Sequence, residues 1–337
     1  MIKYNIPVNV RVPAAAILVF AAFLTGVTGC GGKEEKVESI TVGMEATAVN
    51  SLIYIAENQK YFQANGLNIT IRDNYPSGAA AAEGMLKGEV DVSTAAELAI
   101  VRQAFARESI VTLASIDRFM HMKLIGRKDR AILDIPDLKG KKIGVPVKTA
   151  ADFNLGRFLD LNGIKVNQVT VVDVQAPKAV DSLINGEVDA VVAWQPNVQA
   201  IEDRLAGGAS IWSVHSGQPI YCAVVTTGNL ATSRPNLIKR FLNSLGQAED
   251  YLVRNPDQAR DIVQKRLGYD DRYIRNIWPE HEFSLRLDQA LILAMEDQAR
   301  WMINNNLTTE KTVPNFLDYI NVDGVKAVKP GAVNIIR

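Results

Sequence analysis

The chain has 337 residues, of which 47% are hydrophobic and 22% are charged, and its 37 basic side chains balance its 37 acidic ones. This length exceeds one average domain and predicts two lobes or two domains with a large core. A net charge of zero, with no run of basic residues interleaved with aromatics, argues against a nucleic-acid-binding protein.

The first thirty residues differ in character from the rest. Lys3 and Arg11 precede an apolar run whose uninterrupted part, residues 14–24, is shorter than the ~20 residues that a membrane-spanning helix needs. This pattern predicts a signal peptide over residues 1–29. The stretch VTGC resembles the bacterial lipobox, so we expect cleavage before Cys30, lipidation of its sulfur and a flexible tether over residues 30–38. An ordinary cleavage site with an incidental cysteine is the alternative.

Cys222 is the one other cysteine of the sequence, so the mature chain can form no internal disulfide bond. Its neighbours in IYCAVV are apolar, and no charged residue or histidine adjoins it. We therefore expect a buried structural thiol rather than a nucleophile.

Two stretches of the chain repeat one order of elements, strand and helix alternating three times. Apolar periodicity and terminating glycines predict this order first over residues 39–109, with strands at 39–45, 67–73 and 90–94. The same order recurs over residues 141–208, with strands at 141–147, 167–174 and 188–194. Such alternation predicts two parallel sheets with right-handed crossovers.

The sequence GEVD occurs once in each stretch, at residues 88–91 and 186–189. In both places its glycine ends a helix, its valine is the first buried strand residue, and its charged residues are expected to face solvent. We interpret the motif as a mark of architecture and not as a site.

Ligands bind beyond the carboxyl ends of strands in parallel sheets. Two such sheets facing each other would bring six strand-to-helix loops around one cleft, at residues 44–49, 74–79, 93–97, 147–152, 174–178 and 193–196. Three later amphipathic segments, residues 233–256, 255–268 and 286–306, predict helices on the outside of the first lobe.

Candidate ligand-binding residues lie in or near these loops. Helix N-termini attract anions and polar groups, although simple helix capping is the alternative for each. A Trp at a strand end can stack on a ligand or seal the core, and for Asp117 the alternative is an ion pair with Arg118 or across the lobes. His121 lies near a strand end, whereas His215 and His281 are expected to be structural or exposed. The candidates are Glu45, Thr47, Ala48, Ser77, Gly78, Thr94, Ala95, Glu97, Asp117, Lys148, Thr149, Ala150, Trp194 and Gln195.

Residues 38–305 resemble substrate-binding proteins of bacterial ABC transporters, in the group that binds sulfonates, taurine, nitrate or thiamine-precursor pyrimidines. The resemblance rests on YIAENQKYFQANGLNI, SGAAAAEGMLKGEVDVST, DLKGKKIGVPVKTAADF, GEVDAVVAWQPNV and VVTTGNLATSRPNLIKRFL. It implies an α/β type II periplasmic-binding-protein fold. One lobe would comprise residues 39–127 and 227–337 and the other residues 128–226, with crossovers near residues 126–131 and 221–228.

The chain departs from this group at the proposed cleft. KTAAD, with Lys148 and Asp152, replaces part of a hydroxyl-rich anion cradle, SIDRFMHMK is charged and Met-rich, and Glu45 and Glu97 add negative charge. These departures argue against a simple sulfonate or nitrate ligand.

We therefore expect a monomeric, extracytoplasmic, lipid-anchored receptor that passes a small molecule to an ABC permease without a cofactor, a metal or a chemical step. A ligand-binding module for a signalling receptor and an extracytoplasmic enzyme are the alternatives. Against the enzyme, the sequence holds no G-x-S-x-G, H-E-x-x-H, C-x-x-C or phosphate-binding glycine loop, and it lacks the Cys-rich motif of the related pyrimidine synthases.

Overall fold

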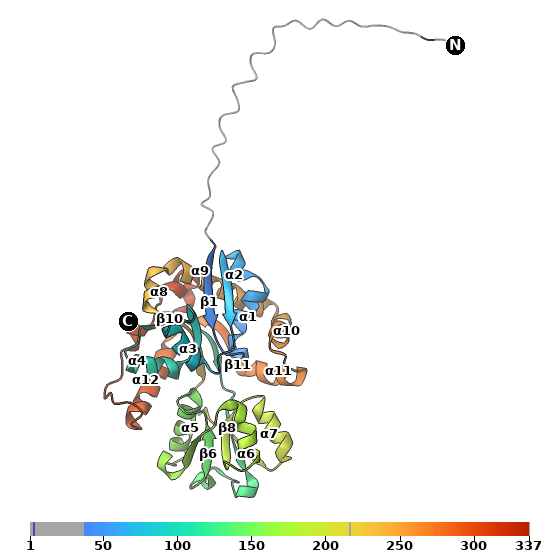
Figure 1. The fold of residues 1–337 in the computed structure, drawn as a ribbon, viewed down its shortest axis with the longest axis vertical. Helices are drawn as coiled ribbons and strands as arrows, with labels where there is room; N and C mark the ends of the chain where they lie inside the picture. Colours follow the sequence, from blue (N-terminus) through green and yellow to red (C-terminus); the bar gives the residue numbers. More distant parts are fainter. Residues whose placement is uncertain (1–2, 4–36, 216, 337) are drawn as a thin grey trace. The chain divides into compact units, whose positions relative to one another are not determined.

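The computed structural model describes Lys3, residues 37–215 and residues 217–336. Cys30 and almost all of the predicted signal peptide therefore lie outside the described residues. Residues 37–337 form one compact unit, which is built on two β-sheets (Figure 1). Among the residues described, no helix is both long and apolar enough to cross a membrane.

The first sheet has six strands in the order β11-β4-β10-β3-β1-β2. β1 is parallel to β2 and β3, whereas β10 is antiparallel to both β3 and β4, and β11 is antiparallel to β4. β1 to β4 therefore share one direction, and β10 and β11 run the opposite way. The strands are β1 (Glu38–Gly43), β2 (Leu67–Arg72), β3 (Val92–Ala96), β4 (Ile110–Phe119), β10 (Ile220–Thr227) and β11 (His281–Arg286).

The second sheet has five strands in the order β7-β6-β8-β5-β9. β6 is parallel to β7 and β8, and β5 is antiparallel to β8 and β9. Its strands are β5 (Lys123–Arg127), β6 (Lys142–Val145), β7 (Thr170–Asp173), β8 (Ala190–Ala193) and β9 (Ala209–Ser213). We call the first sheet with its helices lobe one and the second sheet with its helices lobe two.

The helices of lobe one are α1 (Ser51–Asn58), α2 (Tyr61–Ala64), α3 (Gly78–Leu86), α4 (Glu97–Phe105), α8 (Gly228–Ser233), α9 (Pro235–Arg254), α10 (Pro256–Leu267), α11 (Asp271–Ile277), α12 (Gln289–Asn304) and α13 (Asp323–Val328). Those of lobe two are α5 (Ala150–Leu161), α6 (Ala179–Ile184) and α7 (Asn197–Leu205). Two 3₁₀ helices, η1 (Ala48–Asn50) and η5 (Ala176–Lys178), precede α1 and α6.

Amphipathic spacing explains how α9 covers lobe one. Leu237, Phe241, Leu245 and Ala248 follow one another at four- or three-residue intervals and are all buried. Phe241 stacks on Phe62 of α2 with ring centroids 5.5 Å apart. The helix thus packs against α1, α2 and β11 on the outside of the sheet (Figure 1), as the sequence predicts.

The chain crosses between the sheets earlier than the sequence predicts. β5 pairs with β8 and β9, so residues 123–127 belong to lobe two and not to lobe one. β10 pairs with β3 and β4, so residues 220–226 belong to lobe one and not to lobe two. The crossings lie at residues 120–122 and 214–219 instead of near residues 126–131 and 221–228, because the apolar strands β5 and β10 follow the crossings and do not form them.

The two crossing segments are hydrogen-bonded to each other. The Met122 backbone N donates to Nε2 of His215 at 2.8 Å, and the Val214 N donates to the Met122 carbonyl at 3.4 Å. His215 can accept this bond only when it is uncharged, and burial lowers its pKa to about 4. His215 is therefore structural, as expected from its sequence context.

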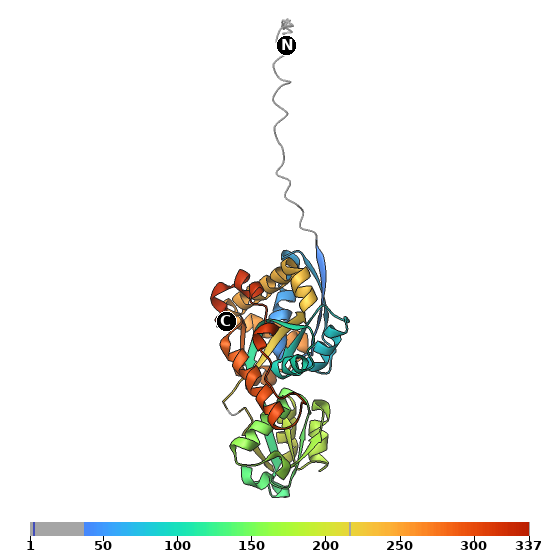
Figure 2. The same cartoon turned by 90° about the vertical axis from the view of Figure 1, so that its left-hand side faces the viewer.

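Lobe two also packs against lobe one through α5. The Phe153 ring meets the Trp301 ring of α12 edge-on at 5.4 Å, and Arg157 pairs with Asp297 at 2.6 Å. A Cβ atom on Gly156 would lie 2.7 Å from the Trp301 indole, so this close approach requires glycine. α12 accordingly extends from lobe one to the level of α5 (Figure 2).

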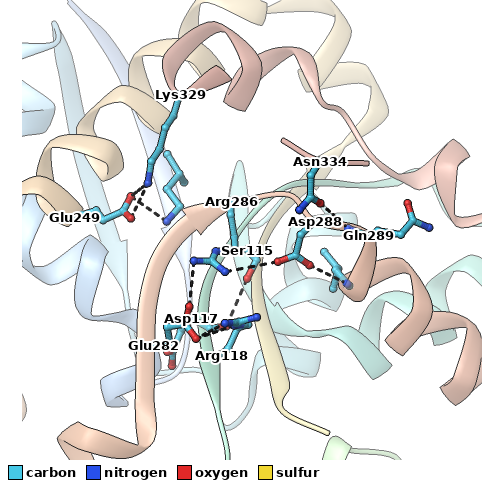
Figure 3. Close-up of polar contacts among 12 residues, drawn as sticks. Ser115, Asp117, Arg118, Glu249, Glu282, Arg286, Asp288, Gln289, Lys329 and Asn334 are labelled. Atoms are coloured by element: carbon cyan, nitrogen blue, oxygen red, sulfur yellow. Dashed lines mark hydrogen bonds and ion pairs between the residues drawn. The ribbon is translucent and has the colours of Figure 1, made fainter. Parts of the chain in front are cut away.

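The C-terminal residues pack on lobe one beside the end of β11 (Figure 3). Lys329 Nζ lies 2.7 Å from both carboxylate oxygens of Glu249, and the Gln289 N donates to Asn334 Oδ1 at 3.0 Å. A short bridge between Leu287 and Val333 continues this contact. These contacts attach the C-terminal segment to α9, to the start of α12 and to the residue that follows β11.

The GEVD repeat has the same structural role in both lobes. Gly88 and Gly186 have φ of +78° and +77° at the ends of α3 and α6, where a left-handed residue ends a helix. Oδ2 of Asp91 accepts a hydrogen bond from the Thr41 N of β1 at 2.7 Å, and Oδ2 of Asp189 accepts one from the Lys142 N of β6 at 2.9 Å. The motif therefore joins each helix end to the neighbouring strand.

Replacing Asp91 with Ala tests this role. The variant leaves the Thr41 N without its carboxylate acceptor, and we expect a loss of about 1–2 kcal/mol in the free energy of unfolding, measured by urea denaturation. Lys87→Ala, at an exposed position in the same turn, is the control and should be neutral. Equal stability of Asp91→Ala and wild type would contradict the structural interpretation of the motif.

Candidate ligand-binding site

A cavity of about 460 Å³ lies where the loops of the two sheets meet. This volume is within the range of small-molecule pockets in proteins. All six predicted loops contribute to its lining, which consists of Glu45, Ala46, Thr47, Ala48, Val49, Pro76, Ser77, Gly78, Ala79, Ala96, Ala99, Phe119, His121, Met122, Pro146, Lys148, Thr149, Ala150, Ala151, Gln175, Ala176, Pro177, Trp194, Gln195, Pro196, Ile220, Tyr269, Tyr273, Ile277 and His281.

Most of the candidate residues are brought together on this lining. They are Glu45, Thr47, Ala48, Ser77, Gly78, Lys148, Thr149, Ala150, Trp194 and Gln195. Their contact with a ligand stays a prediction.

The hydroxyl groups at the helix starts differ in what they bind. Ser77 Oγ accepts from the Ala80 N at 3.2 Å, and Thr149 Oγ1 accepts from the Ala151 N at 3.2 Å while donating to the Pro146 carbonyl at 2.7 Å. These two hydroxyls cap α3 and α5, which is the alternative that the sequence left open. Thr47 Oγ1 is buried and has no hydrogen-bond partner among the described residues.

Gly78 lets the start of α3 lie directly on the sheet. A Cβ atom at this position would come within 3.0 Å of the Ala95 Cα and of the Thr94 carbonyl oxygen. A larger residue would therefore displace α3 from β3 and change the wall of the cavity.

The other four candidates lie behind the wall rather than on it. Thr94, Ala95, Glu97 and Asp117 are each at most 1% exposed. Their strand and helix positions place them next to the cavity, but their side chains point into the packed interior, where ligand contact would require a rearrangement.

Glu97 is a buried carboxyl with protein partners on both oxygens. Gln298 Nε2 donates to Oε1 at 2.8 Å and the Tyr221 N donates to Oε2 at 3.0 Å. Burial raises the pKa of Glu97 to about 7 in spite of these bonds. The group therefore joins α4, α12 and β10 beneath the cavity floor.

Asp117 is paired with a histidine that the sequence reasoning placed outside the site. Its Oδ2 lies 2.6 Å from Nδ1 of His281 at the start of β11, and both side chains are at most 2% exposed. Arg118 instead pairs with Glu282 of the adjacent strand (Figure 3), so the alternative of an ion pair of Asp117 with Arg118 or across the lobes is absent among the described contacts. Burial raises the pKa of Asp117.

Aromatic rings form a continuous series along one wall. His121 stacks on Phe119 at 4.5 Å and lies 6.5 Å from Trp194 of lobe two and 5.5 Å from His281. Burial lowers the pKa of His121 well below its ordinary value, so the ring is uncharged near neutral pH. The series begins in lobe two and ends in lobe one, across the first crossing.

Two tyrosines of the α11 region also line the cavity, and sequence reasoning missed them. Tyr273 donates to the Gln195 carbonyl at 3.0 Å, which joins lobe one to lobe two at the cavity rim. Tyr269 meets Tyr273 edge-on at 4.4 Å. The spacing of these tyrosines and the short segment YDDRYIRN could have indicated one helix face, but nothing local shows that this face meets the cleft.

Cys222 is buried, which confirms the structural thiol expected from the sequence. Burial raises the pKa of its thiol well above the ordinary value, so it is not an activated nucleophile. Among residues 37–215 and 217–336, no group of three or more His, Cys, Asp and Glu side chains is arranged to hold a metal ion.

Comparison with known proteins identifies the family to which the chain belongs. Residues 47–259, more than half of the chain, match the model of a family described as NMT1/THI5 like. The chain belongs to the NMT1/THI5-like family.

Relatives of this NMT1/THI5-like protein include binding proteins and an enzyme. The taurine-binding periplasmic protein of Escherichia coli is 25% identical over 222 residues, which cover 65% of this chain and 68% of the relative. The 4-amino-5-hydroxymethyl-2-methylpyrimidine phosphate synthase of Schizosaccharomyces pombe is 22% identical over 236 residues, which cover 64% and 65% of the two chains.

The fold also matches solved structures. The alkanesulfonate-binding protein SsuA from Xanthomonas axonopodis pv. citri, bound to MOPS, superposes with a TM-score of 0.73 at 18% identity and covers 84% of this chain and 98% of that one. The predicted α/β periplasmic-binding-protein fold is thereby confirmed, and the resemblance to the sulfonate, taurine and pyrimidine group is confirmed by the relatives.

Replacing Glu97 with Gln tests whether the buried Glu97 carboxyl group has a raised pKa. Because the folded protein keeps the Glu97 proton to a higher pH than the unfolded chain, the free energy of unfolding falls as the pH rises from about 4.5 to about 7. The amide stays uncharged in this window and can still accept from the Tyr221 N. We expect little difference from wild type at the acid end and a gain on the order of 2 kcal/mol at pH 8.

Urea unfolding of both proteins across this pH range measures the effect. His215 titrates in both proteins and cancels in the difference. An equal change in stability at both ends of the pH range would show that Glu97 does not carry the raised pKa.

Proposed function

We propose that this NMT1/THI5-like protein is an extracytoplasmic solute receptor that captures one small organic molecule in the interlobe cavity and delivers it, unchanged, to an ABC permease. The observation that carries the proposal is the cavity itself, which loops from both sheets line together. A ligand that contacts both lobes at once can shift the protein toward a closed state, because closure then adds contacts that each lobe alone lacks.

The proposed ligand is sulfonate- or taurine-like or pyrimidine-like, in line with the taurine-binding protein and the pyrimidine phosphate synthase among the relatives. The lining favours a molecule with a planar or apolar part over a small inorganic anion. Trp194, Phe119, Tyr269 and Tyr273 offer ring surfaces, and no arginine of the described residues lines the cavity.

An enzyme is the second candidate, because the buried pair of Asp117 and His281 adjoins the cavity and a synthase is among the relatives. Such a pair can orient a general base. The thiol nearest to this pair is buried with a raised pKa, however, and the described lining contains no cysteine. Turnover of a bound ligand, followed by NMR, distinguishes an enzyme from a receptor. A third candidate is a ligand-binding module for a signalling receptor. It would bind the same ligand, but its ligand-bound form would contact a signalling protein instead of an ABC permease.

Ligand binding is tested by thermal shift and calorimetry with sulfonates, taurine, nitrate and pyrimidines, and by mass spectrometry of molecules released from freshly purified protein. We expect one class to raise the melting temperature, and Trp194→Ala to weaken its binding about tenfold or more through the loss of ring contact. Trp194→Phe, which keeps a ring, is the matched control. If no small molecule stabilises the protein, the proposed receptor function is wrong.

We further propose that Cys30 is lipidated after removal of residues 1–29 and anchors the protein to a membrane, as the VTGC sequence suggests. Cells grown with radioactive palmitate should label the wild-type protein and leave Cys30→Ser unlabelled. Labelling of both proteins, or of neither, would favour an ordinary cleavage site.

A further inference from the structure

The charged groups of the cavity lining are few, and they are unequal in exposure. Glu45 is the one carboxylic acid and Lys148 the one lysine among the described residues that line it. Glu45 lies between β1 and η1 in lobe one and is partly buried, whereas Lys148 lies before α5 in lobe two and is exposed.

The carboxyl group of Glu45 has no hydrogen-bond or ion-pair partner among the described residues. Its backbone carbonyl accepts from Asn50 Nδ2 at 2.9 Å and from the Thr47 N at 3.0 Å, but no hydrogen bond or ion pair reaches its side chain from the described residues. Burial alone raises the pKa of Glu45 to about 7. By contrast, Glu97 and Asp117, the other acids near the cavity, are held by Gln298 and His281.

Lys148 does not neutralise Glu45 in this structure. No ion pair joins the two side chains, and Lys148 is oriented by its own loop. Its φ is +67° and its backbone N donates to Asp152 Oδ2 at 2.9 Å. An unpaired carboxylate in such a site is costly unless a bound molecule supplies a positive or N–H-bearing group.

The surroundings of Glu45 suit a positive group. Tyr269 lies near Glu45, because the negative charge of Glu45 contributes to the raised pKa of the Tyr269 hydroxyl. Tyr273 in turn meets the Tyr269 ring edge-on. Trp194 adds a ring from lobe two. The faces of such rings attract cations, including planar ones such as guanidinium.

We propose that the ligand of this cavity is an organic cation whose protonated amine or amidine group binds the Glu45 carboxylate beside Tyr269. The inference rests on the proposed receptor function and narrows its ligands to those that carry a positive group, which excludes simple sulfonates. It also accounts for the absence of arginine from the described lining, since a cation needs none.

The hydroxyl groups at the helix starts do not make a strong anion site. Thr149 accepts from the Ala151 N and donates to the Pro146 carbonyl, so its hydroxyl is not free to bind a sulfonate or carboxylate oxygen. The O–H groups of Ser77, which caps α3 as an acceptor, and of Thr47 are uncharged donors. An anionic group near Glu45 would in addition be repelled by its carboxylate.

The test uses the full chain and pairs of probes that differ in charge but little in shape. Benzamidine is compared with benzamide, benzylamine with benzyl alcohol, and benzenesulfonate represents anions. Calorimetry is carried out at pH 8, where Glu45 is ionised, on wild type, on Glu45→Gln and on Glu202→Gln, an exposed control in α7.

We expect each cation to bind wild type at least about tenfold more tightly than its uncharged partner, and Glu45→Gln to lose this preference while Glu202→Gln keeps it. The comparison of probes on wild type does not depend on how any variant folds. The inference is overturned if cations bind wild type and Glu45→Gln equally well. It is also overturned if wild type prefers benzenesulfonate or the uncharged probes. In both cases the proposed receptor function remains valid.

The charge of the molecule released from purified protein distinguishes a cationic ligand from an anionic or uncharged one. A released cation that binds Glu45→Gln more weakly supports the inference. A released anion or neutral compound overturns it but supports the receptor. If no molecule is released and no compound of any class binds, both the inference and the proposed function fail.

Discussion

The direction of two strands, β5 and β10, determines where every loop of the cavity lies. Only residues 120–122 join the end of β4 to the start of β5, so these two strand ends must lie together. β8 and β9 are antiparallel to β5 and therefore end where β5 begins, and β6 and β7 share the direction of β8. In lobe one, β10 begins beside the end of β4, and β1, β2 and β3 end at the same rim. The six strand-to-helix loops consequently meet in one cavity.

This arrangement separates the roles of the acidic residues near the cavity. Glu97 and Asp117 lie one layer behind the lining, where hydrogen-bonded partners compensate part of the cost of burial. Glu45 lies on the lining itself and has no such partner in the part of the chain that the structure describes. The same protein interior therefore contains acids that hold elements together and one acid that remains available for another molecule.

The repeat explains why so much of the fold could be predicted from sequence. Period-two strands, periodic helices and the glycines at 88 and 186 are local signals, and they placed all six predicted segments at the cavity, although residues 93–96 of the third belong to β3. Membership of a sheet is not local: KLIGR in β5 and IYCAVVTT in β10 are apolar strands whose partners are far away in the chain, so both crossings were misplaced. Tyr273 and His281 were missed for the same reason, since α11 and β11 reach the cavity only through the tertiary fold. Capping by Ser77 and Thr149 could not be distinguished from ligand contact until the hydrogen bonds were known.

Hydrogen exchange with and without the molecule released from purified protein tests the central claim most directly. If one ligand lies between both lobes, backbone amides at residues 44–50 and 76–80 of lobe one and at residues 147–152 and 194–199 of lobe two become protected together at a single ligand concentration. Protection restricted to one lobe, or located away from these loops, would contradict a cavity shared by the two sheets.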